Sequence, residues 1–175
     1  MMPLPHPGRI AAVLLGVLLQ GAPAAADLLA PPRGETSIAL DDELTLFVRT
    51  PEAGKVVAEI YRGDVFMQGL MFGNALFDDG DLKRVRLCPG CGEVVFLAIP
   101  DRSSTYGAVS GVIVWRDERS FPRWEMTELP LMRPYVTEPD AKGLSRLMDD
   151  AMDSAKRPLT VEYRFRDGSL ERVSP

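Results

Sequence analysis

The fold class follows from the stretch Glu93-Val94-Val95-Phe96-Leu97-Ala98-Ile99, which Pro100-Asp101 closes. A short, continuous apolar run that ends at turn residues is typical of a buried strand. Comparable runs recur about every ten residues along the chain; they cover residues 44–48, 56–61, 65–72, 82–87 and 106–115. This recurrence predicts a β-rich chain built on an antiparallel sheet or a small sandwich.

One helix is predicted near the C-terminus, over about residues 139–156. Its apolar residues recur at helical spacing: Ala141, Leu144, Leu147, Met148, Ala151, Met152 and Ala155. Thr137 suits the N-cap, and Pro158 stops the helix. Strand-like residues on both sides of Asp167-Gly168 predict a C-terminal hairpin, because Asp-Gly favours a tight turn. The sequence therefore predicts an α+β fold, in which one helix packs on a meander and the hairpin completes the sheet.

The first 26 residues have the pattern of a secretory signal peptide. Residues 10–19 are apolar but only about half as long as a bilayer-spanning helix, and Ala24-Ala25-Ala26 supplies the small residues that a signal peptidase requires. We expect cleavage after Ala26 and export to the periplasm, with an uncleaved anchor as the alternative. Residues 27–37 are expected to form a flexible arm, and residues 38–175 a single α+β domain.

Composition excludes several functions. The net charge of −5 argues against nucleic acid and anionic membrane as partners. No later segment is long and apolar enough to span a membrane, so we expect no span after signal cleavage. The single histidine, His6, lies in the signal segment, so the exported part lacks a His-activated nucleophile and a histidine metal triad.

Cys88 and Cys91 are the only cysteines, and they enclose Pro89-Gly90. An oxidising compartment favours a structural disulfide across this turn. A thiol–disulfide oxidoreductase is the second possibility, but the apolar run after Cys91 predicts a strand, whereas such enzymes place the first cysteine at a helix N-terminus.

Metal binding is the third possibility for the thiol pair. Cys-Pro-x-Cys-Gly resembles one knuckle of rubredoxins and zinc ribbons, which implies that a metal at Cys88 and Cys91 needs two further ligands from carboxylates or a second chain. Soft-metal capture is the fourth, because thiolates and thioethers suit Cu(I). The methionines considered for it are Met67, Met71, Met126 and Met132.

Carboxylates offer a weaker hypothesis, a hydrolase acting on envelope polysaccharide through a carboxylate pair. The candidates are Glu59, Asp64, Asp79, Asp81 and Glu93. The run Asp78-Asp79-Gly80-Asp81 is interpreted as a turn rather than a calcium site, because it lacks the spacing of an EF-hand loop.

Two groups of residues are candidates for partner binding. Arg123, Trp124 and Met126 lie in a proline-flanked stretch that we expect to form an exposed loop, although a tryptophan more often belongs to a core. Lys83, Arg84 and Arg86 form a basic cluster that either steers an acidic partner or protects a sheet edge.

Together these features predict an exported, non-enzymatic binding or accessory module of the inhibitor, immunity or assembly type. Its expected partner is another periplasmic or envelope protein, with no catalytic residues and no cofactor. The alternative is a periplasmic thiol-redox or metal-delivery protein that uses Cys88 and Cys91.

Overall fold

The computed structural model describes residues 36–78, 81–117 and 123–173. These residues form twelve strands and no helix. The strands are β1 (Thr36–Ala39), β2 (Leu44–Glu52), β3 (Lys55–Arg62), β4 (Val65–Gly73), β5 (Leu82–Val85), β6 (Val94–Pro100), β7 (Val109–Arg116), β8 (Trp124–Leu129), β9 (Pro134–Val136), β10 (Leu147–Met152), β11 (Pro158–Arg166) and β12 (Ser169–Arg172).

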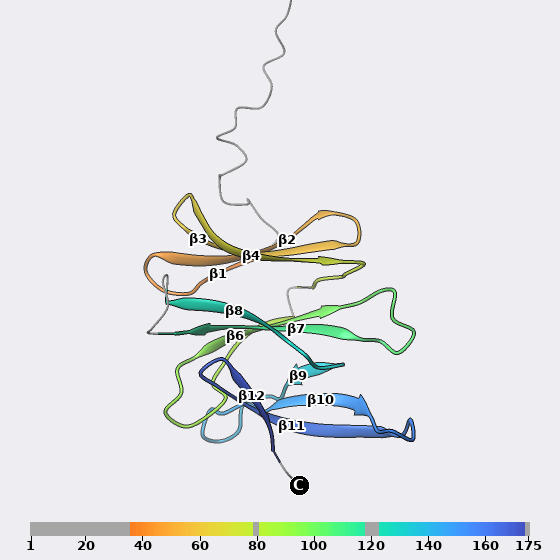
Figure 1. The fold of residues 1–175 in the computed structure, drawn as a ribbon. Helices are drawn as coiled ribbons and strands as arrows, with labels where there is room; N and C mark the ends of the chain where they lie inside the picture. Colours follow the sequence, from red (N-terminus) through yellow and green to blue (C-terminus); the bar gives the residue numbers. More distant parts are fainter. Residues whose placement is uncertain (1–35, 79–80, 118–122, 174–175) are drawn as a thin grey trace, which may run out of the picture.

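The strands form three antiparallel sheets of four, and each sheet is a meander of consecutive strands. We call β1–β4 the first sheet, β5–β8 the central sheet and β9–β12 the third sheet. Figure 1 shows them stacked as three layers, with the central sheet between the other two. The prediction of a β-rich antiparallel architecture is confirmed.

The central sheet is covered on both faces, which explains why β6 is apolar without a break. Val95 and Leu97 belong to a core cluster shared with the first sheet. Val94 and Phe96 belong to a second cluster shared with the third sheet. Because successive side chains of a strand point to opposite faces, a strand between two layers must be apolar at every position.

The outer sheets have the alternating pattern of strands with one buried face. In β2, Leu44, Leu46 and Val48 are fully buried, and the residues between them are partly exposed. This alternation follows from the two-residue period of side chains along a strand.

The predicted helix at residues 139–156 is wrong, and with it the α+β class. Asp140 accepts hydrogen bonds from the backbone N–H of Lys142 (2.8 Å) and Leu144 (3.0 Å), which makes a turn. Asp153 does the same with Ala155 and Arg157, at 2.8 and 2.9 Å. An aspartate that bonds nearby backbone N–H groups competes with helix formation.

Between these two turns the chain is strand β10. Leu147 (1% exposed) and Asp149 (3% exposed) are buried, and Met148 and Asp150 between them are partly exposed. The apolar residues at helical spacing therefore do not share one buried face. β10 instead pairs with β9 and β11.

The C-terminal hairpin is confirmed, because β11 and β12 pair in register across Asp167-Gly168. The arm predicted over residues 27–37 overlaps β1 by two residues. Thr36 and Ser37 belong to β1 and pair with Val48 and Phe47. The proposed signal segment, residues 1–26, and the rest of the arm lie outside the described residues.

Candidate functional site

The two cysteines close the turn between β5 and β6. Their Cα atoms are 5.3 Å apart and their sulfurs are paired as a disulfide. The Cys91 N–H donates to the Cys88 carbonyl oxygen (3.3 Å), and Gly90 has a φ of 75°, which a residue without a Cβ adopts at no steric cost. After the turn the chain enters β6 at Val94, so no helix N-terminus lies beside the sulfurs.

The turn between β11 and β12 lies opposite the disulfide. Asp167 and Gly168 have φ values of 48° and 77°, as in the type I′ turns that favour Asp-Gly. Gly168 is pressed against the indole of Trp115: a Cβ at this position would lie 2.6 Å from Trp115 Cζ2. The hairpin is therefore seated directly on β7.

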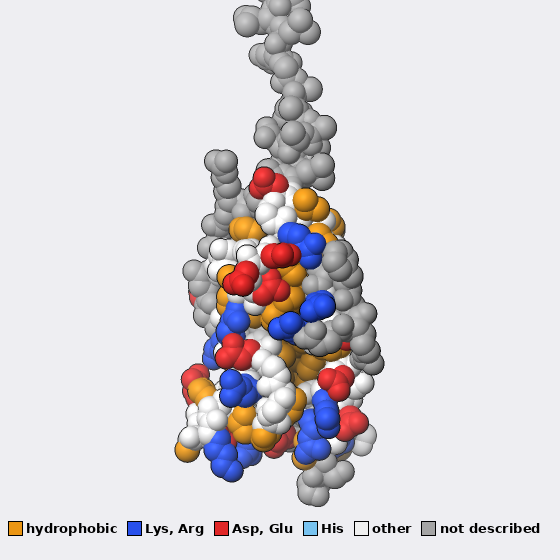
Figure 2. All heavy atoms as spheres, turned by 90° about the vertical axis from the view of Figure 1, so that its left-hand side faces the viewer, with side chains coloured by type: hydrophobic (Ala, Val, Ile, Leu, Met, Phe, Trp, Pro, Cys, Tyr) orange, Lys and Arg blue, Asp and Glu red, His pale blue; other side chains and the backbone are white. Residues whose placement is uncertain are grey.

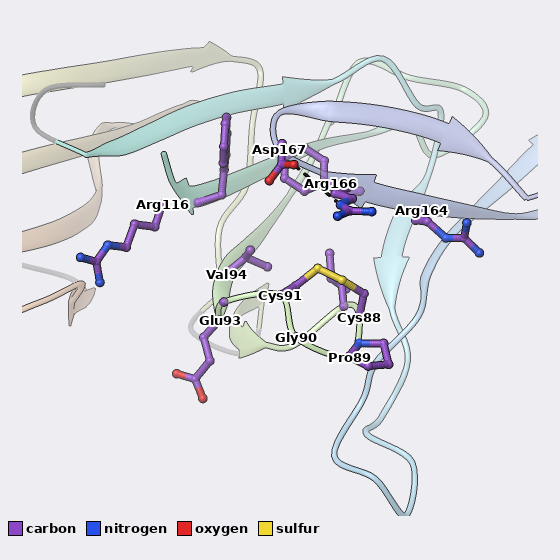
Figure 3. Close-up of a pocket in the computed structure, with 14 residues that line it drawn as sticks. Cys88, Pro89, Gly90, Cys91, Glu93, Val94, Arg116, Arg164, Arg166 and Asp167 are labelled. Atoms are coloured by element: carbon purple, nitrogen blue, oxygen red, sulfur yellow. Dashed lines mark ion pairs between the residues drawn. A yellow bond between two sulfur atoms is a disulfide. The ribbon is translucent and has the colours of Figure 1, made fainter. Parts of the chain in front are cut away.

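A groove of about 660 Å³ lies between these two turns. Figure 3 shows the disulfide turn on one side, and Arg164, Arg166 and Asp167 of the hairpin on the other. The lining residues are Leu87, Cys88, Pro89, Gly90, Cys91, Gly92, Glu93, Val94, Trp115, Arg116, Arg164, Phe165, Arg166 and Asp167. We call this space the disulfide groove.

Two buried aromatic side chains line the disulfide groove. Trp115 and Phe165 meet edge to face, with ring centroids 5.8 Å apart. The Trp115 indole N–H donates to Thr127 Oγ1 (3.1 Å), so the only polar atom of the ring is satisfied within the protein. The two rings thus give the groove an apolar, fixed part of its lining.

The charges of the disulfide groove are mainly basic. Arg116, Arg164 and Arg166 line it together with two carboxylates, Glu93 and Asp167. Arg166 Nε lies 3.7 Å from Asp167 Oδ2, and both side chains are about three-quarters exposed, so this ion pair contributes little to stability. Figure 2 shows this face of the molecule, with basic and acidic side chains interspersed on both sides of an uncharged strip in its lower half.

The predicted basic cluster lines a second groove of about 530 Å³. Lys83, Arg84 and Arg86 meet Glu93 and Glu138 there: Lys83 lies 3.4 Å from Glu138, and Arg84 and Arg86 lie 3.5 and 3.9 Å from Glu93. Arg84 also donates to the Ala39 carbonyl oxygen. Glu93 lines both grooves, so the basic cluster adjoins the disulfide groove.

The expected exposed loop around Trp124 is wrong. Trp124 and Met126 are 5% and 7% exposed in strand β8 and pack in the core between the first and central sheets. The Trp124 indole N–H donates to Asp41 Oδ2 (2.8 Å). Arg123 is exposed just before the strand, in a left-handed conformation with a φ of 73°. Trp124 and Met126 are buried, whereas Glu125 and Thr127 are partly exposed, which is the two-residue period of a strand. The flanking prolines favoured a loop in the sequence-based prediction.

The carboxylate candidates are spread over separate elements. Glu59 lies in β3 and pairs with Arg49 at 3.2 Å, Asp64 lies in the β3–β4 turn, and Glu93 precedes β6. The Asp81 N–H donates to the Asp78 carbonyl oxygen (2.9 Å), as expected for a turn. Burial raises the pKa of Asp81, and the nearby Asp78 carboxylate adds to that rise. Asp79 lies outside the described residues.

Metal ligands do not gather around the thiol pair in the described part of the chain. The described residues contain no group of three or more His, Cys, Asp or Glu side chains placed to hold a metal ion. None of Met67, Met71, Met126 or Met132 lines the disulfide groove; Met67 and Met126 pack instead against the core of the first sheet.

Comparison with other proteins gives no family for this chain. No protein-family model, curated protein or solved structure matches it. Within the described residues no helix could cross a membrane.

The sequence indicated only part of this site. The cysteines, the basic cluster and the Asp-Gly turn were recognised, but Trp115, Arg116, Arg164, Phe165 and Arg166 were not connected with them. Their proximity depends on the stacking of the third sheet on the central one. Contacts between layers leave no periodic signal along the chain.

Proposed function

We propose that this protein is an exported binding module that recognises an acidic, extended segment of another envelope protein in the disulfide groove. The observation that carries the proposal is that two packed aromatic rings and several arginines line one groove. Arginine and buried aromatic residues dominate the binding energy of protein interfaces.

The charge of the groove favours an acidic partner. Arg164 and Arg166 line the groove beside the Asp167 carboxylate, and the other lining carboxylate, Glu93, is already shared with Arg84 and Arg86. A guanidinium can bind a carboxylate through two parallel hydrogen bonds, which fixes orientation as well as charge. The neighbouring groove adds Lys83, Arg84 and Arg86, which are paired there with Glu93 and Glu138.

The walls of the groove favour binding without rearrangement. The disulfide restricts the conformations of the Cys88–Cys91 turn, and the contact of Gly168 with Trp115 fixes the opposite hairpin. A site whose walls are already ordered loses less conformational entropy when a partner binds. In this proposal the disulfide has a structural role, and export depends on the signal peptide expected over residues 1–26.

A thiol-redox module is the alternative, and one observation favours it. The disulfide lines the largest groove described above, and cationic arginines beside a cysteine stabilise its thiolate. Reduction would break the S–S bond with two electrons and two protons from a dithiol partner, which would itself become a disulfide. Metal delivery needs two ligands beyond Cys88 and Cys91.

Site-specific photo-cross-linking tests the proposal. A photoreactive residue at position 164, in the groove, is expected to capture an envelope protein. The matched control is position 102, because Arg102 is also an exposed arginine but lies in the turn between β6 and β7. Equal capture from both positions, or none from position 164, contradicts the proposed site.

A second experiment separates the two functions. The Cys88→Ser/Cys91→Ser variant is expected to keep partner binding if the disulfide only orders the turn. The thiol-redox alternative predicts a different result. In that case the variant loses an oxidoreductase activity and no longer binds the partner, although circular dichroism shows that its fold is intact.

A further inference from the structure

Strand β4 is an edge of the first sheet, and its sequence differs from those of the other edge strands. Val65-Phe66-Met67-Gln68-Gly69-Leu70-Met71-Phe72-Gly73 contains nine residues and neither a charge nor a proline. Apart from its pairing with β3, no backbone hydrogen bond joins β4 to another part of the described chain. Natural proteins usually protect a long edge strand from pairing with other chains.

The other five edge strands have such protection. β1 and β9 have four and three residues, and β9 includes Pro134. β5, β8 and β12 carry charged side chains: Lys83 and Arg84, Glu125 and Glu128, and Glu171 and Arg172. Among the described residues β4 is therefore the only edge strand of more than four residues that lacks both charge and proline, and its one irregularity is a register shift at Met67.

Several large apolar side chains on this edge are exposed. Val65, Phe66 and Met71 are 61%, 47% and 69% exposed. On the outer face of the first sheet, Phe66 continues an edge-to-face row with Tyr61 and Phe47, with ring centroids 5.7 Å apart at each step. An exposed apolar patch of this kind marks a protein interaction surface.

We propose that β4 pairs with β4 of a second copy of this chain, antiparallel and about a two-fold axis. Each strand is uncharged, so self-pairing places no like charges opposite each other, whereas β8 would oppose its own glutamates. Between Gln68 and Gly73 the register with β3 is unbroken, so this part of the strand offers a regular edge to a second copy. Such a strand suits the self-complementary contact that two-fold symmetry requires.

The pairing joins the two first sheets into one sheet of eight strands. The regular part of β4, Gln68–Gly73, is about 20 Å long, which allows a short ladder between the copies. The disulfide groove lies between the central and third sheets and stays open in this dimer. A dimer thus carries two grooves for two segments of a partner.

Light scattering after size exclusion tests the dimer. The purified protein at micromolar concentration is expected to have twice the mass of one chain. Met71→Lys is expected to reduce this to the mass of one chain, since it adds to the apolar edge a lysine, the side chain with which natural edge strands resist pairing. Tyr106→Lys is the control and should remain dimeric. It adds the same charge at a residue that is 60% exposed and lies between β6 and β7, away from the edge.

Hydrogen exchange in the unmodified protein locates the contact. It tests the proposal even if the Met71→Lys variant fails to fold. Amides of residues 65–73 in the unmodified protein are expected to exchange more slowly as its concentration rises, and those of β12 are not. A wild-type protein that is monomeric throughout, a folded Met71→Lys variant that remains dimeric, or protection that does not change in β4 overturns the proposal. A monomer that binds an extended strand of another protein at β4 does the same.

Discussion

Replacing Gly168 by alanine should destabilise the third sheet more than its turn conformation alone explains. With a φ of 77°, alanine would be in the left-handed region, which costs about 1–2 kcal/mol. Its Cβ would also lie 2.6 Å from Trp115 Cζ2, and overpacking of this kind costs about 1–3 kcal/mol more. We therefore expect the free energy of unfolding to fall by about 2–5 kcal/mol.

Gly63→Ala provides the matched control. Gly63 also lies in a hairpin turn with positive φ (54°), but a Cβ there would meet nothing within 4 Å. Only the backbone term remains, and we expect a loss of about 1–2 kcal/mol. Urea unfolding followed by tryptophan fluorescence should resolve the difference, because 2 kcal/mol moves the midpoint by roughly 1 M when m is about 2 kcal/mol/M.

A double-mutant cycle tests the cause. Phenylalanine lacks the Cζ2 and Cη2 atoms of the indole, so Gly168→Ala in a Trp115→Phe background should cost no more than Gly63→Ala. Equal midpoint shifts for Gly168→Ala and Gly63→Ala in the native background would refute the seating of the hairpin on Trp115.

Three further predictions concern the disulfide and two aspartates. Replacing Cys88 and Cys91 by serine should lower the free energy of unfolding by only about 2 kcal/mol, since the closed loop is short, and a loss of folding on urea titration would contradict this. Asp149 is buried and accepts hydrogen bonds from two backbone N–H groups, so Asp149→Ala should cost about 2–4 kcal/mol and Asp149→Asn less, as thermal melts can show; equal costs would argue against these bonds. Burial raises the pKa of Asp41, but hydrogen bonds from the Glu43 N–H and the Trp124 indole N–H outweigh burial, so the pKa is lowered. The wild type should therefore lose stability as the pH falls below about 4, and Asp41→Asn should lose less. Unfolding curves measured at each pH check this difference.

Strand positions were predictable where apolar residues follow a strand period. The run from Val94 to Ile99 has no polar interruption, and this reflects burial of both faces between two outer sheets. The sequence shows that such a strand is buried, but it does not show how many layers surround it. The stacking of three sheets depends on contacts between residues far apart in the chain.

The wrong prediction of a helix over residues 139–156 has a specific physical cause. Leu147, Met148, Ala151 and Met152 satisfy helical spacing as well as they satisfy a short strand, and short apolar runs are ambiguous between the two. Asp140 and Asp153 favour turns over a helix, because each accepts hydrogen bonds from the backbone N–H groups two and four residues later. The pKa of each is lowered, mainly by the N–H groups of Leu144 and Arg157 respectively.

Charge reversal in the disulfide groove shows whether this groove recognises an acidic segment. Once cross-linking has identified the partner, its affinity should be measured for the wild type, Arg164→Glu and the control Arg102→Glu. A charge-assisted hydrogen bond contributes about 1.5–3 kcal/mol, so we expect Arg164→Glu to weaken binding at least about tenfold and Arg102→Glu to leave it unchanged. Equal affinities for the wild type and Arg164→Glu would contradict recognition of an acidic segment in this groove.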